Sequence, residues 1–181
     1  LMMYDNLMKC SANFDRFMNF GSGAEVKHNT PYGFSKRIIS QLMENNPKNI
    51  SVRIYSVFDE NELDQRFIKS SIQNYINKKD IVIHQNKKMD LFYMKDLISL
   101  VEWYINLNGG EYNRDFINCG YLEKYTLFQV ANLINNLDEH KVVIRIEDDL
   151  DGEDYCESYS ALPFKLIGLE EGIKETYNKL K

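Results

Sequence analysis

The apolar residues of the chain recur in two spacings, one typical of helices and one of strands. Phe34, Ile38, Ile39 and Leu42 follow one another at intervals that place them on one face of a helix, whereas the stretch 50–58 favours a strand. Applied along the chain, the same criteria predict helices at 2–13, 32–45, 63–77, 94–107, 126–137 and around 169–180, and strands at 16–20, 50–55, 81–85, 114–118 and 141–146.

These strands alternate with helices, which is the order that builds βαβ units around a largely parallel sheet. A chain of 181 residues with 44% hydrophobic residues is long enough to bury one real core. The sequence therefore predicts an α/β fold.

Composition excludes several classes of partner and site. A net charge of −5 without a block of lysine or arginine argues against a nucleic-acid partner. No apolar run approaches the roughly 18 residues that a membrane span needs, so no membrane partner is expected.

Three scattered cysteines (Cys10, Cys119, Cys156) favour reduced thiols and a cytoplasmic location. His28, His84 and His140 are equally isolated, so no metal site is predicted.

The candidate chemistry lies at the start of the predicted helix 32–45. Tyr32 and Lys36 stand four residues apart, just over one turn, and therefore share a face of this helix. Since a nearby cation favours the phenolate form of a tyrosine, Tyr32 is a candidate general acid or base. Lys36 would then donate hydrogen bonds to a ribose. The spacing alone fits equally a half-buried tyrosine and a lysine on an ordinary amphipathic helix.

The elements around this helix favour the catalytic interpretation. A strand at 16–20, a small-residue turn at 21–24, the Tyr32–Lys36 helix and a further strand follow in order. This order resembles the second half of an extended short-chain dehydrogenase/reductase of the NAD(P)-dependent sugar-nucleotide epimerase/dehydratase family. The resemblance continues in the segments 84–97, 116–120 and 165–173.

The resemblance implies a Rossmann-like, doubly wound parallel sheet with a small C-terminal substrate lobe, and NAD or NADP as the cofactor. In this family a Ser or Thr, a Tyr and a Lys form the catalytic triad. Tyr32 and Lys36 match it directly and would also bind the cofactor. The hydroxyl position aligns with Gly23, so either the neighbouring Ser22 substitutes, contacting the substrate as well, or Ser22 only satisfies a turn.

Other contacts with a nucleotide-sugar substrate are implied in the same way. Tyr55 and Ser56 follow the strand at which the family places an asparagine near the sugar-nucleotide phosphates, so we expect Tyr55 at the cofactor and Ser56 at the substrate. Glu25 stands where dehydratases place an acid, but the preceding acid is replaced by Ala24, which disfavours dehydration. Lys88 lies where a basic residue would meet a diphosphate. Epimerisation and reduction both stay open, as does a catalytically degraded relative that binds a nucleotide or a protein.

The resemblance also implies how the chain is organised. Residues 1–58 would be the C-terminal part of the NAD(P)-binding Rossmann domain, and residues 59–181 a mixed region with remaining strands and the substrate lobe. The glycine-rich loop that binds the pyrophosphate, in roughly the first third of such an enzyme, would precede Leu1, so the 181 residues alone are not expected to bind NAD(P). A homodimer through helices 2–13 and 32–45 is expected from their apolar residues.

Overall fold

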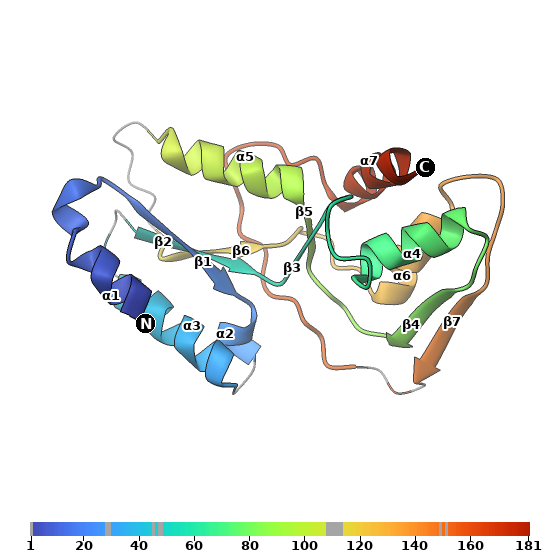
Figure 1. The fold of residues 1–181 in the computed structure, drawn as a ribbon, viewed down its shortest axis with the longest axis horizontal. Helices are drawn as coiled ribbons and strands as arrows, with labels where there is room; N and C mark the ends of the chain where they lie inside the picture. Colours follow the sequence, from blue (N-terminus) through green and yellow to red (C-terminus); the bar gives the residue numbers. More distant parts are fainter. Residues whose placement is uncertain are drawn as a thin grey trace. The chain divides into compact units, whose positions relative to one another are not determined.

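A computed structural model describes residues 2–27, 30–44, 46, 49–107, 114–148, 150 and 152–181 (Figure 1). Contacts between Cα atoms divide the chain into two compact units. The first unit contains residues 1–55 and 98–119, and the second contains residues 56–97 and 120–181. This division rests on contacts alone, so a change of functional domain at residues 58 and 59 stays a prediction.

The first unit is built on a three-stranded parallel sheet. Its strands are β1 (Phe17–Ser22), β2 (Asn49–Ile54) and β6 (Phe116–Cys119), in the order β1-β2-β6. Ser22 of β1 is in register with Ile54, which in turn is in register with Cys119. The carboxyl ends of all three strands therefore meet at one edge of the sheet.

Short helices flank this sheet in the sequence. They are α1 (Met2–Met8), the 3-10 turn η1 (Ser11–Asn13), α2 (Ala24–Lys27) and α3 (Pro31–Met43), and the later part of α5 (Met94–Ile105) belongs to the same unit. Helix α3 begins where the sequence predicts, because the Thr30 hydroxyl accepts a hydrogen bond from the Gly33 N–H (3.0 Å) and Pro31 occupies the first turn.

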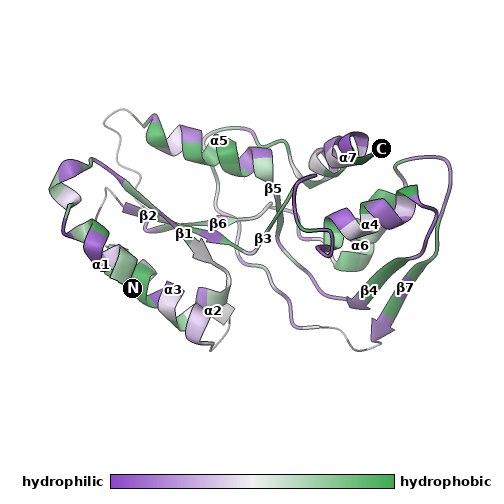
Figure 2. Cartoon of the chain, in the orientation of Figure 1, coloured by the Kyte–Doolittle hydropathy of each residue, from purple (hydrophilic) through white to green (hydrophobic). Residues whose placement is uncertain are grey.

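The described residues of the second unit form two pairs of parallel strands, and helices pack with them. Strand β3 (Ser56–Phe58) pairs with β5 (Leu91–Tyr93), and β4 (Ile81–Gln85) pairs with β7 (Ile144–Asp148). Helices α4 (Phe67–Ile76), α6 (Leu127–Asn135) and α7 (Leu169–Leu180) complete it. Their hydrophobic residues, which alternate with hydrophilic ones along each helix in Figure 2, contribute to one core. Its members include Phe58, Ile72, Tyr75, Ile83, Val130, Ile134 and Ile173.

Most predicted elements occur within a few residues of their expected places, and the pairings are parallel as expected. The predicted helix 2–13 is wrong in its second half, since α1 ends at Met8 and only a 3-10 turn follows. The stretch 50–58 is two strands, separated at Tyr55, that belong to different sheets. Among the described residues, no helix is long and apolar enough to cross a membrane.

A buried carboxylate joins three segments of the second unit. Asp96, in the first turn of α5, accepts hydrogen bonds from the Ile167 N–H (2.7 Å), the Gly168 N–H (3.0 Å) and the Tyr121 hydroxyl (2.6 Å). The Tyr121 oxygen in turn accepts a hydrogen bond from the Tyr93 N–H (3.0 Å). These bonds fix the turn that leads into α7, where Gly168 has a φ of 95°.

Glu62 makes the stability of the second unit depend on pH. Its carboxylate accepts the Lys69 N–H (3.0 Å) in the first turn of α4, and its side chain is 9% exposed. Burial raises the pKa of Glu62 to about 7 from its ordinary 4.5, and nearby Asp59 adds to this rise, although Arg66 and Lys69 oppose it. Because the folded state holds this proton more tightly, the stabilisation is complete below pH 4.5 and is lost as the pH rises toward 7.

We therefore expect the wild type to lose stability relative to Glu62→Gln as the pH rises through this window, because the variant lacks the Glu62 proton. Urea denaturation measures this difference in stability. Both proteins are unfolded at several pH values, from below 4.5 to above about 7. A stability difference that stays constant across these pH values would contradict the assignment.

Candidate active site

The carboxyl edge of the β1-β2-β6 sheet is the natural place for a site, because ligands of open α/β sheets bind where parallel strands end. Ser22 ends β1, Gly23 follows it, and Tyr55 follows β2. Helix α3 begins eight residues after Gly23 and carries the Tyr32–Lys36 pair. The structure thus brings the predicted catalytic residues into one unit.

Tyr32 and Lys36 lie together on α3 as their spacing predicts. The Lys36 Nζ is 5.8 Å from the centroid of the Tyr32 ring, and Tyr32 is 57% exposed. The same Nζ donates a hydrogen bond to the Phe20 carbonyl oxygen of β1 (2.8 Å). A lysine ammonium carries three donors, so this bond holds α3 against β1 and leaves donors for a ligand.

Ser22 is buried within the turn that follows β1. Its hydroxyl oxygen accepts a hydrogen bond from the Ala24 N–H (3.2 Å), and its own N–H donates to Glu25 Oε1 (3.1 Å). The hydroxyl contact is the turn contact that the sequence gives as the alternative to a catalytic role.

Gly23 stands where the resemblance expects a hydroxyl, and the ring of Tyr55 fills the adjacent space. A Cβ atom at residue 23 would lie 2.2 Å from Tyr55 Cδ1 and 2.4 Å from Cε1. Real Cβ contacts do not occur at such distances, so a side chain at residue 23 requires the buried Tyr55 ring to move. The glycine at 23 and the tyrosine at 55 are therefore sterically matched.

This match predicts a coupled effect of two substitutions. Gly23→Ala should destabilise the protein by about 1–3 kcal/mol, because it overpacks the contact with Tyr55. In a Tyr55→Ala background the same change should cost much less, since the ring is gone. Denaturation of both single variants and of the double variant measures this coupling. Strictly additive effects would contradict it.

Glu25 lies inside the protein in this structure. Its side chain is 1% exposed, its Oε1 accepts the Ser22 N–H, and its Oε2 is 3.4 Å from Arg53 Nε. The Arg37 Nε donates to the Glu25 carbonyl oxygen (2.6 Å). The sequence indicates Glu25 as a substrate contact, but no local motif in it indicates Arg53 or Arg37.

The remaining predicted substrate contacts, Ser56 and Lys88, belong to the second unit. The buried Ser56 accepts a hydrogen bond from Arg66 Nη2 (3.2 Å) at its hydroxyl oxygen. The backbone N–H of Lys88 donates to Asp154 Oδ1 (2.8 Å). Arg66 is a further cation beside a predicted contact, and no motif in the sequence indicates it.

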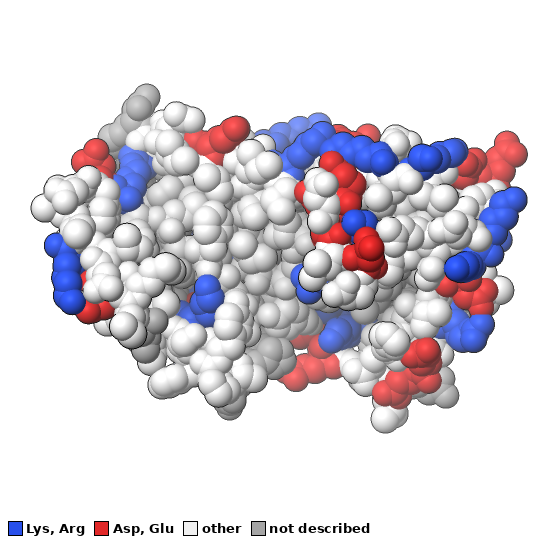
Figure 3. Space-filling view, viewed as in Figure 1, with Lys and Arg blue, Asp and Glu red and all other residues white. Residues whose placement is uncertain are grey.

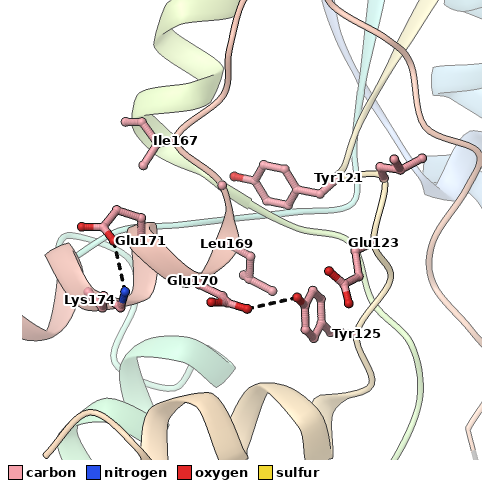
Figure 4. A pocket seen from close by; sticks show the side chains of 10 residues that line it. Tyr121, Glu123, Tyr125, Ile167, Leu169, Glu170, Glu171 and Lys174 are labelled. Atoms are coloured by element: carbon pink, nitrogen blue, oxygen red, sulfur yellow. Dashed lines mark hydrogen bonds and ion pairs between the residues drawn. The ribbon is translucent and has the colours of Figure 1, made fainter.

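The second unit also contains a pocket of about 440 Å³ that the sequence did not predict (Figure 4). Tyr121, Tyr125, Glu170 and Lys174 are among its lining residues. The Tyr125 hydroxyl donates to Glu170 Oε1 (3.2 Å), and burial together with Glu123 and Glu170 raises the pKa of Tyr125.

Within the described residues, no group of three or more His, Cys, Asp or Glu side chains is arranged to hold a metal ion. His28 lies outside these residues.

Comparison with known proteins finds similar solved structures but no matching sequence family. No family model and no curated protein sequence matches the chain. Among solved structures, the UDP-glucuronic acid 4-epimerase from Bacillus cereus, in complex with UDP-glucuronic acid and NAD, is similar with a TM-score of 0.71 at 13% identity. The match covers 98% of this chain and 65% of that one.

Two further solved structures show the same relationship. The dTDP-glucose 4,6-dehydratase of Bacillus anthracis in complex with NAD has a TM-score of 0.71 at 15% identity, with 97% of this chain and 65% of that chain covered. A GDP-L-fucose synthetase from Naegleria fowleri has a TM-score of 0.69 at 16% identity, with 97% and 68% covered.

The chain spans about two thirds of the length of these structures. At 13–16% identity the likeness concerns the fold. The fold class and the resemblance predicted from the sequence are confirmed at that level: the chain has the Rossmann-type α/β fold of extended short-chain dehydrogenases/reductases.

Proposed function

We propose that the protein catalyses NAD(P)-dependent epimerisation or ketoreduction of a nucleotide-activated sugar. The observation that carries this proposal is the Tyr32–Lys36 pair on α3, held against β1 beside the carboxyl ends of parallel strands. In this proposal the exposed Tyr32 phenol exchanges a proton with the sugar, and Lys36 lies beside its ring on the same face of α3. NAD and the nucleotide sugars named with the similar structures support the choice of reactants.

The residues near Tyr32 fit a dinucleotide at this edge of the sheet. Lys36 uses one donor on the Phe20 carbonyl, which leaves two for a ribose, and Tyr55 borders the same turn. NAD(P), when bound, supplies or accepts the hydride. Ser22 is the proposed hydroxyl near the sugar, and Ser56 and Lys88 are proposed to contact the nucleotide end of the substrate.

A second candidate is a catalytically degraded protein that binds a nucleotide or a protein partner. The match between Gly23 and Tyr55 favours it, because it leaves no room for a hydroxyl side chain at residue 23. The hydrogen bond from the Ala24 N–H to the Ser22 hydroxyl oxygen also favours the degraded protein, because it is the turn contact of a serine without a catalytic role.

Turnover by the full product of the gene decides between these candidates. The protein is incubated with NAD or NADP and a panel of UDP-, dTDP- and GDP-sugars, and products are identified by NMR. Steady conversion of one sugar supports the enzyme. Binding of the cofactor without conversion or hydride exchange in any sugar supports the degraded protein and contradicts the first proposal.

We propose that the protein forms a homodimer through α1 and α3. Met2, Met3, Phe34 and Leu42 on these helices are exposed. The surface over α1 and α3 in Figure 3 is mostly uncharged. Burying an exposed apolar surface of this kind favours association.

The proposal also includes a cytoplasmic location and no nucleic-acid partner, on the grounds of the cysteine pattern and the net charge of −5.

Charged substitutions test this interface. Met3→Glu and Leu42→Glu should convert the dimer to a monomer in sedimentation velocity at micromolar concentration, because each places a carboxylate in an apolar contact. Leu63→Glu, a similarly exposed leucine in the second unit, is the matched control and should leave the dimer intact. A wild-type protein that sediments as a monomer would refute the interface.

A further inference from the structure

The carboxylate of Glu25 is a buried charged group at the candidate site. It lies in α2, directly after the turn that contains Ser22 and Gly23, and its side chain is almost fully buried. Burying a charge is costly unless the charge is paired and hydrogen-bonded, so its contacts indicate what it does.

The first contact satisfies a backbone group that the sheet does not. The Gly23 N–H donates to the Ile54 carbonyl oxygen of β2 (2.9 Å), and successive N–H groups of a strand point to opposite sides. The Ser22 N–H therefore points away from β2, and Glu25 Oε1 accepts it at 3.1 Å. Glu25 thus fixes the backbone of Ser22 itself.

Gly21 provides the space for this contact. A Cβ atom at residue 21 would lie 2.5 Å from Glu25 Oε1 and 2.8 Å from Ser51 Oγ. A side chain at this position would displace the carboxylate from the strand. The two glycines on either side of Ser22 therefore have separate roles, since Gly21 leaves room for Glu25 and Gly23 leaves room for Tyr55.

The second contact ties Glu25 to the neighbouring strand. Oε2 faces Arg53 Nε of β2 at 3.4 Å, and both side chains of this ion pair are largely withdrawn from solvent. The guanidinium of Arg53 also lies over the ring of Phe116 in β6, with its central carbon 3.7 Å from the centroid. Through Arg53, the carboxylate connects the end of β1 with β2 and β6.

The third contact reaches the helix that carries the candidate acid/base. Arg37, the residue after Lys36, donates from Nε to the Glu25 carbonyl oxygen (2.6 Å). Lys36 itself donates to the Phe20 carbonyl oxygen. Helix α3 is therefore attached to the chain on both sides of the Ser22 turn.

We propose that Glu25 is a positioning residue, whose carboxylate holds Ser22 in place relative to the Tyr32–Lys36 pair. It acts through Ser22 and exchanges no proton with the substrate. This inference rests on the proposed function, because positioning matters only to a reaction at this site. It replaces the expectation that Glu25 contacts the sugar.

Two substitutions of similar size separate positioning from proton chemistry. Glu25→Gln keeps an oxygen that can accept the Ser22 N–H but cannot act as an acid or base at neutral pH. Glu25→Met fills the space without an acceptor. Glu102→Gln, an exposed glutamate of the first unit, is the control. For the full-length protein we measure kcat and KM for the nucleotide sugar, and hydrogen exchange at the Ser22 amide.

We expect Glu25→Gln to retain Ser22 protection and kcat within about threefold. Glu25→Met should lower kcat at least about tenfold with KM changed less than about twofold, and should expose the Ser22 amide to exchange. A loss of kcat in Glu25→Gln as large as in Glu25→Met, with Ser22 still protected, would overturn the proposal in favour of acid/base chemistry. A raised KM in both would overturn it in favour of a substrate contact.

The exchange measurement keeps the two proposals separate. If the wild type turns over no nucleotide sugar, the proposed function fails and the positioning role falls with it, while Ser22 protection still reports whether the contact exists. If the wild type turns over and Glu25→Met retains its kcat, only the positioning role fails. Should Glu25→Met not fold, the kcat of Glu25→Gln decides alone, and a loss above about tenfold overturns the proposal.

Discussion

Replacing Tyr32 by phenylalanine is expected to lower turnover of the full-length protein by about 10²–10⁴-fold, the usual contribution of a positioned general acid or base. The ring and its contact with Lys36 remain, so the structure of α3 should be preserved. Only the proton that the phenol would exchange is lost. Binding of the nucleotide sugar, measured by calorimetric titration, should change little, because the effect falls on kcat.

Tyr4→Phe is the matched control for this experiment. Tyr4 lies on α1, and its hydroxyl donates to the Leu42 carbonyl oxygen at the surface (3.1 Å). Removing this phenol should leave turnover close to that of the wild type. Wild-type rates in Tyr32→Phe would refute the role of Tyr32 and with it the main ground for the proposed enzyme.

Replacing Asp96 by alanine is expected to destabilise the second unit by about 3–5 kcal/mol, because three donors lose their acceptor at a cost of about 1–3 kcal/mol each before partial hydration. These donors are the Ile167 and Gly168 N–H groups and the Tyr121 hydroxyl. Asp96 is only 1% exposed, so water replaces it poorly. Urea denaturation measures the loss.

Two further variants should destabilise the protein less than Asp96→Ala does. Tyr121→Phe removes one of the three donors, although it also leaves the Tyr93 N–H without that acceptor, and should cost clearly less than Asp96→Ala. Asp64→Ala removes an exposed carboxylate that pairs with Lys69 at the surface and should have little effect. Equal denaturation midpoints for Asp96→Ala and the wild type would show that the network does not hold α7.

The sequence predicts those parts of the fold that a local apolar pattern or a helix cap marks. Strand β4 has its expected bounds of 81–85, and α6 begins after the Thr126 cap, whose hydroxyl accepts the Gln129 N–H (3.2 Å). Strand β5 and helix α2, of three and four residues, are too short to show a period. Helix 2–13 ends early because the Cys10 N–H bonds to the Leu7 carbonyl and the Asn13 N–H to the Cys10 carbonyl, tighter turns that hydrophobic spacing does not reveal.

The candidate site was predictable where its residues are close in sequence. Tyr32 and Lys36 are fixed by one helical turn, and Ser22 by the turn after a strand. The match of Gly23 with Tyr55 and the pairing of Glu25 with Arg53 depend on the parallel register of β1 and β2. No local pattern carries that register, so the sequence could not show that the hydroxyl position is filled or that Glu25 is buried.

The order of the strands has a consequence for folding during synthesis. Strand β2 pairs with β1 upstream but also with β6 far downstream, where Ser51 lies opposite Phe116. Residues 56–97, which belong to the other unit, emerge from the ribosome between them. Pairing between distant segments is slow, and an unpaired strand edge promotes aggregation while it waits. In a nascent chain halted near residue 97, the first unit should therefore be protease-sensitive and depend on chaperones, and it should become protected once the chain has extended past Cys119.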